Sequence, residues 1–171
     1  GAVDSGTKPV AIINLKEFGN TLPPIGYVRY CIENKAECAS WATTAQAVEL
    51  TPDRWSTLFR INTYINNKIA PVSDQDLYGE IERWAMPRYA GDCEDYALLK
   101  QDYLKSLGFP ANTMRMTVVL DEENQGHAVL TLVTNSGDFV LDNRRNDILK
   151  PADTKYTFLK RQSGESPRHW V

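Results

Sequence analysis

The residue types around Cys93 could form a nucleophilic catalytic centre in this chain of 171 residues. Cys93 lies in the segment Gly91-Asp92-Cys93-Glu94-Asp95-Tyr96, where a helix is expected to begin. The unpaired N–H groups and the positive dipole end of a helix start stabilise a thiolate and can donate to a developing oxyanion. We therefore interpret Cys93 as a nucleophile. The alternative is a small buried cysteine that packs at a helix start.

A thiolate nucleophile normally needs an imidazole that takes its proton and returns it to the leaving group. The chain has two histidines, His127 and His169. His169 is two residues from the C-terminus, where a base is difficult to hold in place. His127 begins the apolar run that continues through Val133, which is typical of a rigid strand. His127 is therefore the candidate base, and its alternative role is structural.

Asp142 could orient His127 if the strands that carry these two residues form a hairpin. An even-numbered loop would place Val133 opposite Asp138, and the same register puts Asp142 on the face of His127, one diagonal step away. The carboxylate could then hold the imidazole tautomer and stabilise its charged form. The alternative is a hairpin-end carboxylate that accepts backbone N–H bonds. Asn143 is a second candidate for the orienting residue.

Three acidic residues flank the candidate nucleophile, namely Asp92, Glu94 and Asp95. Their negative charges oppose thiolate formation. A calcium ion, which prefers carboxylate and carbonyl oxygens, would neutralise them, so we expect a calcium site here and no organic cofactor. The alternative is helix capping without a metal, because Asp92 and Asp95 can form a capping-box pair.

Two helices are expected to position these residues. Thr51 and Pro52 are typical of an N-cap and a first helical position, and a stripe of residues at helical spacing follows. This pattern predicts a helix from about Pro52 to Lys68. The second helix opens at Asp92 and stops at Gly108. We interpret both stripes as core contacts. They consist of Trp55, Leu58, Phe59, Asn62, Ile65 and Ile69 in the first helix, and Tyr96, Leu99, Tyr103, Leu104 and Leu107 in the second.

After the second helix, the apolar period changes to two and short polar turns separate the runs, which predicts an antiparallel meander. We expect an α+β fold in which this sheet packs against the two helices. One domain should span residues 1–171, with residues 1–26 as an extended arm that includes a short strand at Val10–Asn14. The sheet strands are predicted at Met114–Leu120, His127–Val133, Phe139–Asp142 and Tyr156–Arg161.

Composition excludes two classes of partner. The net charge is -3 and the sequence contains no cluster of basic residues, so we expect no binding to nucleic acid. No apolar run approaches the ~18 residues that a transmembrane helix needs, so the chain is not expected to span a membrane.

Cys31 and Cys38 are close enough in sequence to form a local disulfide. Such a bond would indicate an oxidising compartment, which in bacteria means the periplasm or the exterior. Two reduced buried thiols are the alternative. A zinc site is disfavoured, because only two thiols are close and neither histidine is near them in the sequence.

The segments that carry these candidates resemble the bacterial transglutaminase-like cysteine peptidase family, whose best-understood members are LapG-like periplasmic proteases. The similarity spans about Asp76 to Trp170 and is carried by the combination of motifs more than by any single residue. The matching segments are Gly91–Tyr96, Gly126–Ala128 and Leu141–Asn143, together with Tyr78, Gly79, Trp84, Pro87 and Arg161–Ser163.

This resemblance implies a papain-like fold with a triad of Cys93, His127 and Asp142, in which the cysteine lies at a helix N-terminus and its partners lie on adjacent strands. It also implies a cleft-lining role for Trp84, for which burial in the core is an equal alternative. The family is calcium-dependent, and its ligand positions match Asp92 and Glu94, with Asp95 as a third candidate.

The function expected from these features is that of a cysteine endopeptidase that performs limited proteolysis on an exported or cell-surface protein. Family members cut cell-surface adhesins and are restrained by an inner-membrane receptor, so an adhesin and a receptor of this kind are candidate partners. The better-known members lack the Cys31/Cys38 pair. Two alternatives are transglutaminase or amidase chemistry on the same triad, and a non-enzymatic binding module on an inherited fold.

Overall fold

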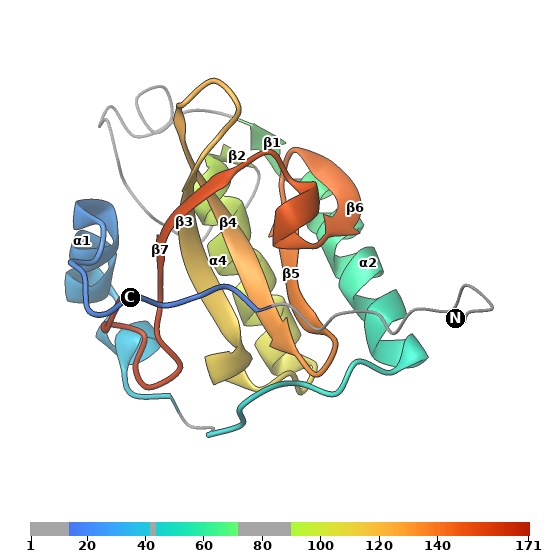
Figure 1. Cartoon of the computed structure of the whole chain (residues 1–171), viewed down its shortest axis with the longest axis horizontal. Coiled ribbons are helices and arrows are strands. Elements are labelled where there is room, and N and C mark those ends of the chain that lie inside the picture. The colour runs from blue at the N-terminus through green and yellow to red at the C-terminus, as the bar shows by residue number, and fades with distance from the viewer. Residues whose placement is uncertain (1–13, 42–43, 72–89) are drawn as a thin grey trace, which may run out of the picture.

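The computed structural model describes residues 14–41, 44–71 and 90–171 (Figure 1). The expected strand at Val10–Asn14 and the candidate cleft residue Trp84 lie outside these residues, apart from Asn14. None of the described helices is long and apolar enough to cross a membrane.

A five-stranded antiparallel sheet carries the candidate base and its orienting residue. Its strand order is β6-β5-β4-β3-β7, so the meander from β3 to β6 is completed by β7, which returns to pair with the free edge of β3. The four predicted strands are confirmed, while β6 was not predicted. The strands are β3 (Met114–Leu120), β4 (Gly126–Thr134), β5 (Gly137–Asp142), β6 (Arg145–Leu149) and β7 (Thr157–Arg161).

The two predicted helices are also confirmed. Helix α2 spans Pro52–Lys68, and the hydroxyl of its N-cap Thr51 accepts a hydrogen bond from the backbone N–H of Arg54. Helix α4 spans Cys93–Ser106 and is followed by Gly108 in a left-handed conformation (φ 94°). Three members of the expected buried stripes are exposed, so that part of the prediction is wrong: Trp55 (37%) and Phe59 (42%) of α2, and Leu107 (56%), the C-cap of α4.

Several short elements were not anticipated by the sequence pattern. Helix α1 precedes the 3-10 helix η1. Two two-residue strands, β1 after α2 and β2 at the start of the nucleophile segment, form a parallel pair. Tyr27 and Tyr30 of α1 contact each other, and Tyr27 also packs against the buried Trp170. These elements are α1 (Ile25–Glu33), η1 (Lys35–Cys38), β1 (Ala70–Pro71), β2 (Ala90–Gly91), η2 (Ala111–Thr113) and η3 (Pro151–Asp153).

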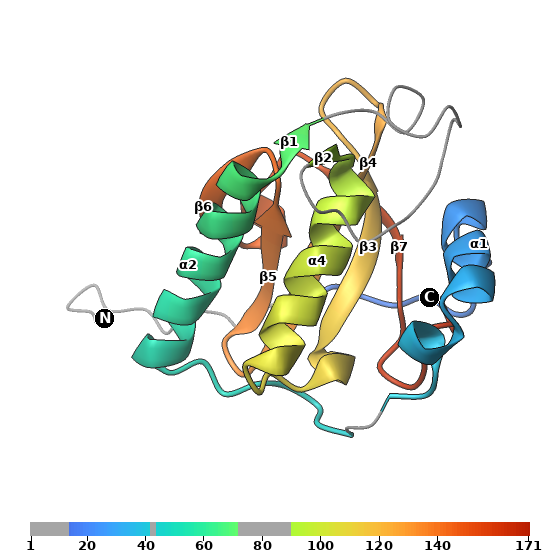
Figure 2. The same ribbon diagram turned by 180° about the vertical axis from the view of Figure 1, so that it is seen from behind.

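Helices α4 and α2 cover one face of the sheet, as the view from behind shows (Figure 2). The main core lies between this face and α4, where alternate residues such as Leu130 and Leu132 pack with Leu98 and Leu104. A smaller cluster of three valines and Tyr156 lies on the opposite face. Residues 14–24 cross that second face (Figure 1), where Glu17 forms a salt bridge of 2.9 Å with Arg161.

The register between β4 and β5 decides which residues can meet at the end of the sheet. Thr134 pairs with Gly137 across a two-residue turn, and Val133 pairs with Asp138 as predicted. Gly137 has a φ of 103°, a conformation that strongly favours glycine. The β3–β4 hairpin and the N-terminal end of α4 lie at the same end of the molecule (Figure 2), so this register places the end of β5 near the start of α4.

Cys31 and Cys38 form a disulfide with a Cα–Cα distance of 5.5 Å, which confirms the predicted bond. It ties the end of α1 to η1, and Cys38 is buried in the main core. The bond therefore holds α1 against the domain as well as closing a loop.

Loss of this disulfide should lower the free energy of unfolding by about 2 kcal/mol, because a short closed loop no longer restricts the unfolded chain. The change to make is Cys31→Ala with Cys38→Ala, measured by urea unfolding. Dithiothreitol should lower the stability of the wild type and leave that of the double variant unchanged. Equal stability of the wild type with and without reductant would contradict the prediction.

Candidate active site

The N-terminus of α4 is built as the sequence predicts. The carboxylate of Asp92 accepts the Cys93 N–H at 2.8 Å, and Asp95 Oδ2 accepts the Asp92 N–H at 3.1 Å. These contacts, with the bond from the Asp95 N–H to the Asp92 side chain, form a capping box. The box fixes Cys93 as the first residue of the helix.

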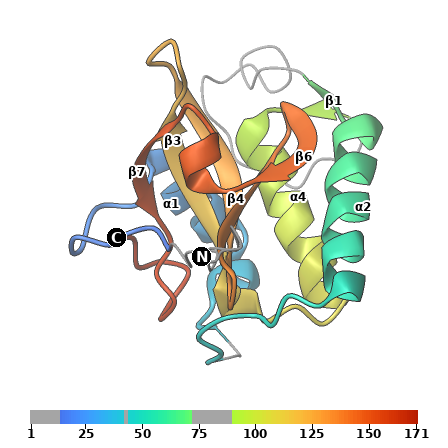
Figure 3. The same cartoon turned by 45° about the vertical axis from the view of Figure 1, so that its right-hand side comes forward.

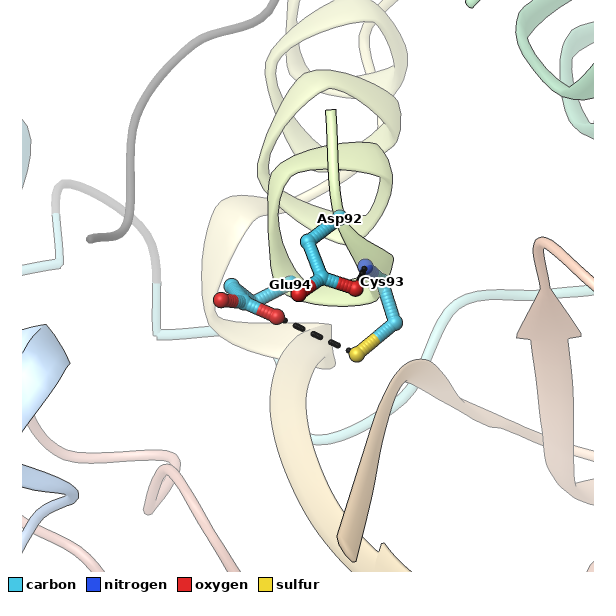
Figure 4. Close-up of side chains that lie close together, drawn as sticks. All are labelled: Asp92, Cys93 and Glu94. Atoms are coloured by element: carbon cyan, nitrogen blue, oxygen red, sulfur yellow. Dashed lines mark hydrogen bonds between the residues drawn. The ribbon is translucent and has the colours of Figure 1, made fainter. Parts of the chain in front are cut away.

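The thiol of Cys93 is half-buried and donates a hydrogen bond to Glu94 Oε2 at 3.1 Å (Figure 4). Burial raises the pKa of this thiol well above its ordinary value. The charges of Glu94 and Asp92 and the bond to Glu94 raise it further, and a bond from the Ala128 N–H has the opposite, smaller effect. Burial and these contacts therefore favour the protonated form of the Cys93 thiol.

The contact with Ala128 locates the sulfur relative to the candidate base. Ala128 follows His127 in β4, so the thiol lies against the strand that carries the histidine. Within the described part of the chain, however, the thiol donates its hydrogen bond to Glu94 and not to His127. The Cys93 thiol therefore lies next to β4 without a hydrogen bond to the His127 side chain among the described residues.

His127 and Asp142 meet directly, as the predicted hairpin register requires. His127 Nε2 lies 2.8 Å from Asp142 Oδ1, and both side chains are almost completely buried. Burial alone would raise the pKa of Asp142, but the hydrogen bonds from His127 and Tyr156 and the charge of His127 outweigh it, and the pKa is lowered to about 2. Asp142 is therefore ionised at neutral pH, and the orienting contact is its own and not that of Asn143.

Tyr156 is a site residue that the sequence interpretation did not identify. Its hydroxyl donates to Asp142 Oδ2 at 2.5 Å, and its ring lies edge-on to the His127 ring at 5.5 Å between centroids. Tyr156 lies just before β7, where an aromatic residue is expected to pack in the core, and it belongs to none of the sequence motifs. The contact exists because β7 returns to the edge of β3, two strands from β5.

The backbone turn after Asp142 completes the support of the carboxylate. The Arg144 N–H donates to Asp142 Oδ1 at 3.1 Å, and the Arg144 guanidinium pairs with Asp121 Oδ2 at 3.0 Å. Asp121 in turn accepts backbone N–H bonds within the β3–β4 turn. The two turns at this end of the sheet are thereby tied together.

The acidic residues near Cys93 separate into two groups. Ligand atoms of Asp92, Cys93 and Glu94 all lie within 4.8 Å of one another, which makes this cluster a candidate cation site. Asp95 is fully buried and its Oδ2 is engaged in the capping box. Asp92 and Glu94 are therefore the better candidate ligands. His169 contacts Asn20 and Glu165, and it takes no part in this cluster.

Removal of the Tyr156 hydroxyl in Tyr156→Phe should lower the free energy of unfolding by about 1–2 kcal/mol at pH 7, because a buried bond to an ionised group is lost. The pKa of Asp142 is lowered from 3.8 to about 2. The stability that depends on ionised Asp142 is therefore fully present above pH 3.8 and is lost as the pH falls toward 2. Urea unfolding at several pH values should show the difference from wild type narrowing over that window.

The exposed Tyr64 offers a matched control for this comparison. Tyr64→Phe should leave the stability unchanged at every pH. A stability loss in Tyr156→Phe that is constant down to pH 2 would argue that the hydroxyl does not act through the Asp142 carboxylate.

Comparison with known proteins identifies the family of the chain. The model of the family described as bacterial transglutaminase-like cysteine proteinase matches residues 17–171. No curated protein shows significant similarity to the chain.

Three solved structures of LapG from Legionella pneumophila have a similar fold. For one of them, the TM-score is 0.59 at 24% identity, and the match covers 72% of this chain and 69% of the LapG chain. A calcium-bound structure has a TM-score of 0.56 at 25% identity, with 66% of each chain covered. For an EGTA-treated structure, the TM-score is 0.56 at 24% identity, and the match covers 66% of this chain and 64% of the LapG chain. The chain thus matches about two thirds of LapG. On the family match over residues 17–171, the chain belongs to the bacterial transglutaminase-like cysteine proteinases.

Proposed function

We propose that the protein is a cysteine endopeptidase in which Cys93 is the nucleophile, His127 the general base and acid, and Asp142 the residue that orients His127. The observation that carries this proposal is the buried hydrogen bond of 2.8 Å between His127 and Asp142, on the strands next to the helix that begins at Cys93. A thiol at a helix start and a buried histidine–carboxylate pair are the groups that acyl transfer uses, which supports the proposal.

The tautomer of His127 follows from its partner. Asp142 is ionised and can only accept, so His127 Nε2 carries the hydrogen that it donates. The other ring nitrogen, Nδ1, is then the atom that can take the thiol proton. Asp142 also balances the positive charge that His127 acquires when it does so.

The proposed reaction has two stages. Cys93 Sγ transfers its proton to His127 and attacks the carbonyl carbon of the scissile peptide bond. The tetrahedral species breaks its C–N bond, and His127 returns the proton to the leaving amine. Water then attacks the thioester and gives a proton to His127, the C–S bond breaks, and His127 returns that proton to the sulfur, which yields the carboxylic acid and the Cys93 thiol.

Burial raises the thiol pKa most, and the charges of Glu94 and Asp92 raise it further, so neutralising the acidic first turn of α4 would favour the first stage at neutral pH. We propose that calcium performs this role, with the carboxylates of Asp92 and Glu94 as ligands. Two carboxylates whose oxygens lie within 4.8 Å of each other suit a hard cation, while the thiol is a poor ligand for it. Bound calcium would supply positive charge that offsets both carboxylates.

The substrate is proposed to be a protein in an oxidising compartment, in the bacterial periplasm or outside the cell. The Cys31–Cys38 disulfide supports this location, since such bonds persist where thiols are not kept reduced. Limited cleavage of an exported or cell-surface protein, such as an adhesin, and control by an inner-membrane receptor are the corresponding proposals for partners. A comparison of surface proteins from cells with active enzyme and with Cys93→Ala would identify the substrate.

Alkylation of Cys93 by iodoacetamide tests the proposed pair of nucleophile and base. In calcium-containing buffer near pH 7, His127→Ala should slow the reaction by about 100-fold, because the imidazole no longer accepts the thiol proton. The matched control is His169→Ala, which should react as fast as wild type because His169 lies outside the site. Equal rates in His127→Ala and wild type would reject His127 as the base.

Hydrolysis and acyl transfer can be separated on the same enzyme, since both pass through the acyl-enzyme. A glutamine-containing peptide and a fluorescent amine are supplied together. Peptide cleavage without amine incorporation is expected. Amine incorporation that outpaces cleavage would replace the peptidase proposal by a transglutaminase.

Calcium binding is expected in wild type and not in Asp92→Asn with Glu94→Gln, measured by titration calorimetry. Asparagine is a good N-cap, so this variant keeps the start of α4 intact. Calcium should also raise the alkylation rate of wild-type Cys93 about tenfold, the effect of lowering the thiol pKa by one unit. Asp53→Asn, in the acidic first turn of α2, is the matched control and should bind as wild type does. Identical titrations for all three proteins would remove the proposed site.

A further inference from the structure

Helix α2 contacts both halves of the proposed active site through its C-terminal end. Figure 3 shows α2 running beside α4 and close to β6, and the short strand β1 follows α2 in the chain. Cys93 begins α4, whereas Asp142 ends β5, and β3 and β4 lie between these two elements in the sequence. A third element that binds both of them can therefore fix their relative position.

Two asparagines of α2 hold the turn that follows Asp142. The Asn66 amide donates to the backbone carbonyl oxygen of Asp142 at 2.9 Å and to that of Arg145 at 3.0 Å. One helical turn earlier, the Asn62 amide donates to the carbonyl oxygens of Arg145 at 3.1 Å and Asn146 at 3.0 Å. Asn62 is completely buried, so the loss of its bonds would leave buried groups unpaired. The end of β5 and the start of β6 are both fastened to α2 in this way.

The same end of α2 also holds the start of α4. Ile69 is the C-cap residue of α2, and its carbonyl oxygen accepts a hydrogen bond from the Tyr96 hydroxyl at 2.6 Å. Both residues are buried, and they pack with Ile65 and Leu99 in a cluster of their own. Strand β1 then pairs in parallel with β2, which directly precedes Asp92. The backbone on both sides of the nucleophile is thus attached to the end of α2.

The contact with Ile69 gives Tyr96 a role that the sequence interpretation did not assign. Tyr96 lies three residues after Cys93 and was expected only as a member of the buried stripe. A phenylalanine would fill the same space, so the stripe does not account for the hydroxyl. Carbonyl groups at the C-terminus of a helix have no partner within the helix, and the Tyr96 hydroxyl supplies one for Ile69.

We propose that residues 66–71, the connecting segment, set the position of Cys93 relative to the pair of His127 and Asp142. Asn66 is a positioning residue that acts through Asp142, and Tyr96 is a positioning residue that acts through the start of α4. A misplacement of about 1 Å between reacting groups can cost roughly 100-fold in rate. Hydrogen bonds that hold both halves of the site to one segment therefore affect the chemistry as well as the fold.

Alkylation of Cys93 by iodoacetamide, in calcium-containing buffer, depends on the relative position of the thiol and the base. Asn66→Ala should slow it by about tenfold, because the turn after Asp142 is no longer held. Asn66→Leu keeps the size of the side chain and removes the donor, so it should slow the reaction equally. Asn67→Ala, at the exposed neighbouring asparagine, is the matched control and should react as wild type does. A wild-type rate in Asn66→Leu would overturn the role of these hydrogen bonds.

The same measurement in an Asp142→Asn background shows through which residue each side chain acts. Asn66→Ala should cause no further slowing there, because its effect passes through the Asp142 carboxylate. Tyr96→Phe should slow the reaction about tenfold in both backgrounds, because it acts on the other half of the site. Tyr64→Phe, at an exposed position, is its control. Equal slowing by Asn66→Ala in both backgrounds would overturn the role of Asn66, and a wild-type rate in Tyr96→Phe that of Tyr96.

Hydrogen exchange separates positioning from a general loss of stability. In Asn66→Ala, the Nε2 hydrogen that His127 donates to Asp142 should exchange with solvent at least about tenfold faster relative to the amide of Leu130. Leu130 is completely buried in the main core, so its amide reports global unfolding. Equal acceleration of both hydrogens would mean that Asn66 only stabilises the fold, which would overturn the inference.

This inference rests on the proposed triad, and the alkylation series distinguishes failure of one from failure of the other. A wild-type rate in Asp142→Asn would reject the triad and the inference with it. Slow alkylation in Asp142→Asn, together with wild-type rates in Asn66→Ala and Asn66→Leu, would reject the inference and leave the triad in place. Should Asn66→Ala fail to fold, Asn66→Leu takes its place in every comparison with the same expectation.

Discussion

The hydrogen bond between His127 and Asp142 depends on the register of β4 against β5. Side chains alternate between the faces of a sheet, so a shift of one residue would move Asp142 to the face away from His127. The turn that fixes the register is at the far end of the hairpin. There the Thr134 hydroxyl donates to the Gly137 carbonyl at 2.6 Å and accepts the Ser136 N–H at 2.9 Å. A local turn thus determines a contact at the other end of the strands, and an error in it would leave a carboxylate buried without its partner.

The surroundings of Asp142 show how a buried charge is maintained. Its two oxygens receive bonds from a ring nitrogen, a backbone N–H and a phenol, which come from β4, the β5–β6 turn and the residue before β7. These contributions come from segments distant in sequence, so the carboxylate also joins them to one another. The pairing of Arg144 with Asp121 extends the connection to the β3–β4 turn. The same contacts that orient His127 therefore also stabilise this end of the sheet.

Local signals in the sequence were sufficient for the elements that carry the proposed triad. Caps at Thr51 and Asp92 marked both long helices, because a cap is a contact between residues at most three apart. The change of apolar period marked β3 and β4, and turn length gave the partner of Val133 correctly. The contact between His127 and Asp142 followed from that register alone. These features are all determined by neighbours along the chain or by one hairpin.

Contacts that depend on the assembled sheet were not accessible in this way. Tyr156 meets Asp142 only because β7 returns to the edge of β3. Strand β6 has an intermediate, exposed, exposed, buried, intermediate pattern and lacks the apolar alternation of its neighbours. Helix α1 follows two prolines and is held by the disulfide and by contacts with Trp170, near the opposite end of the chain. Lys100 is buried although lysine is almost always exposed, so a pattern based on residue types could not predict its position.

The two halves of the proposed site differ in what they need before they can react. The pair of His127 and Asp142 is complete in the resting structure, since its register, burial and hydrogen bonds are all in place. The thiol is not, because Glu94 accepts its hydrogen bond, and burial together with the charges of Glu94 and Asp92 holds its pKa high. A helix dipole contributes only about half a positive charge, which cannot offset the carboxylates beside Cys93. In the proposed mechanism, reactivity is therefore controlled at the acidic turn of α4, and a group that draws Glu94 away from the sulfur would also free the thiol to meet the proposed base.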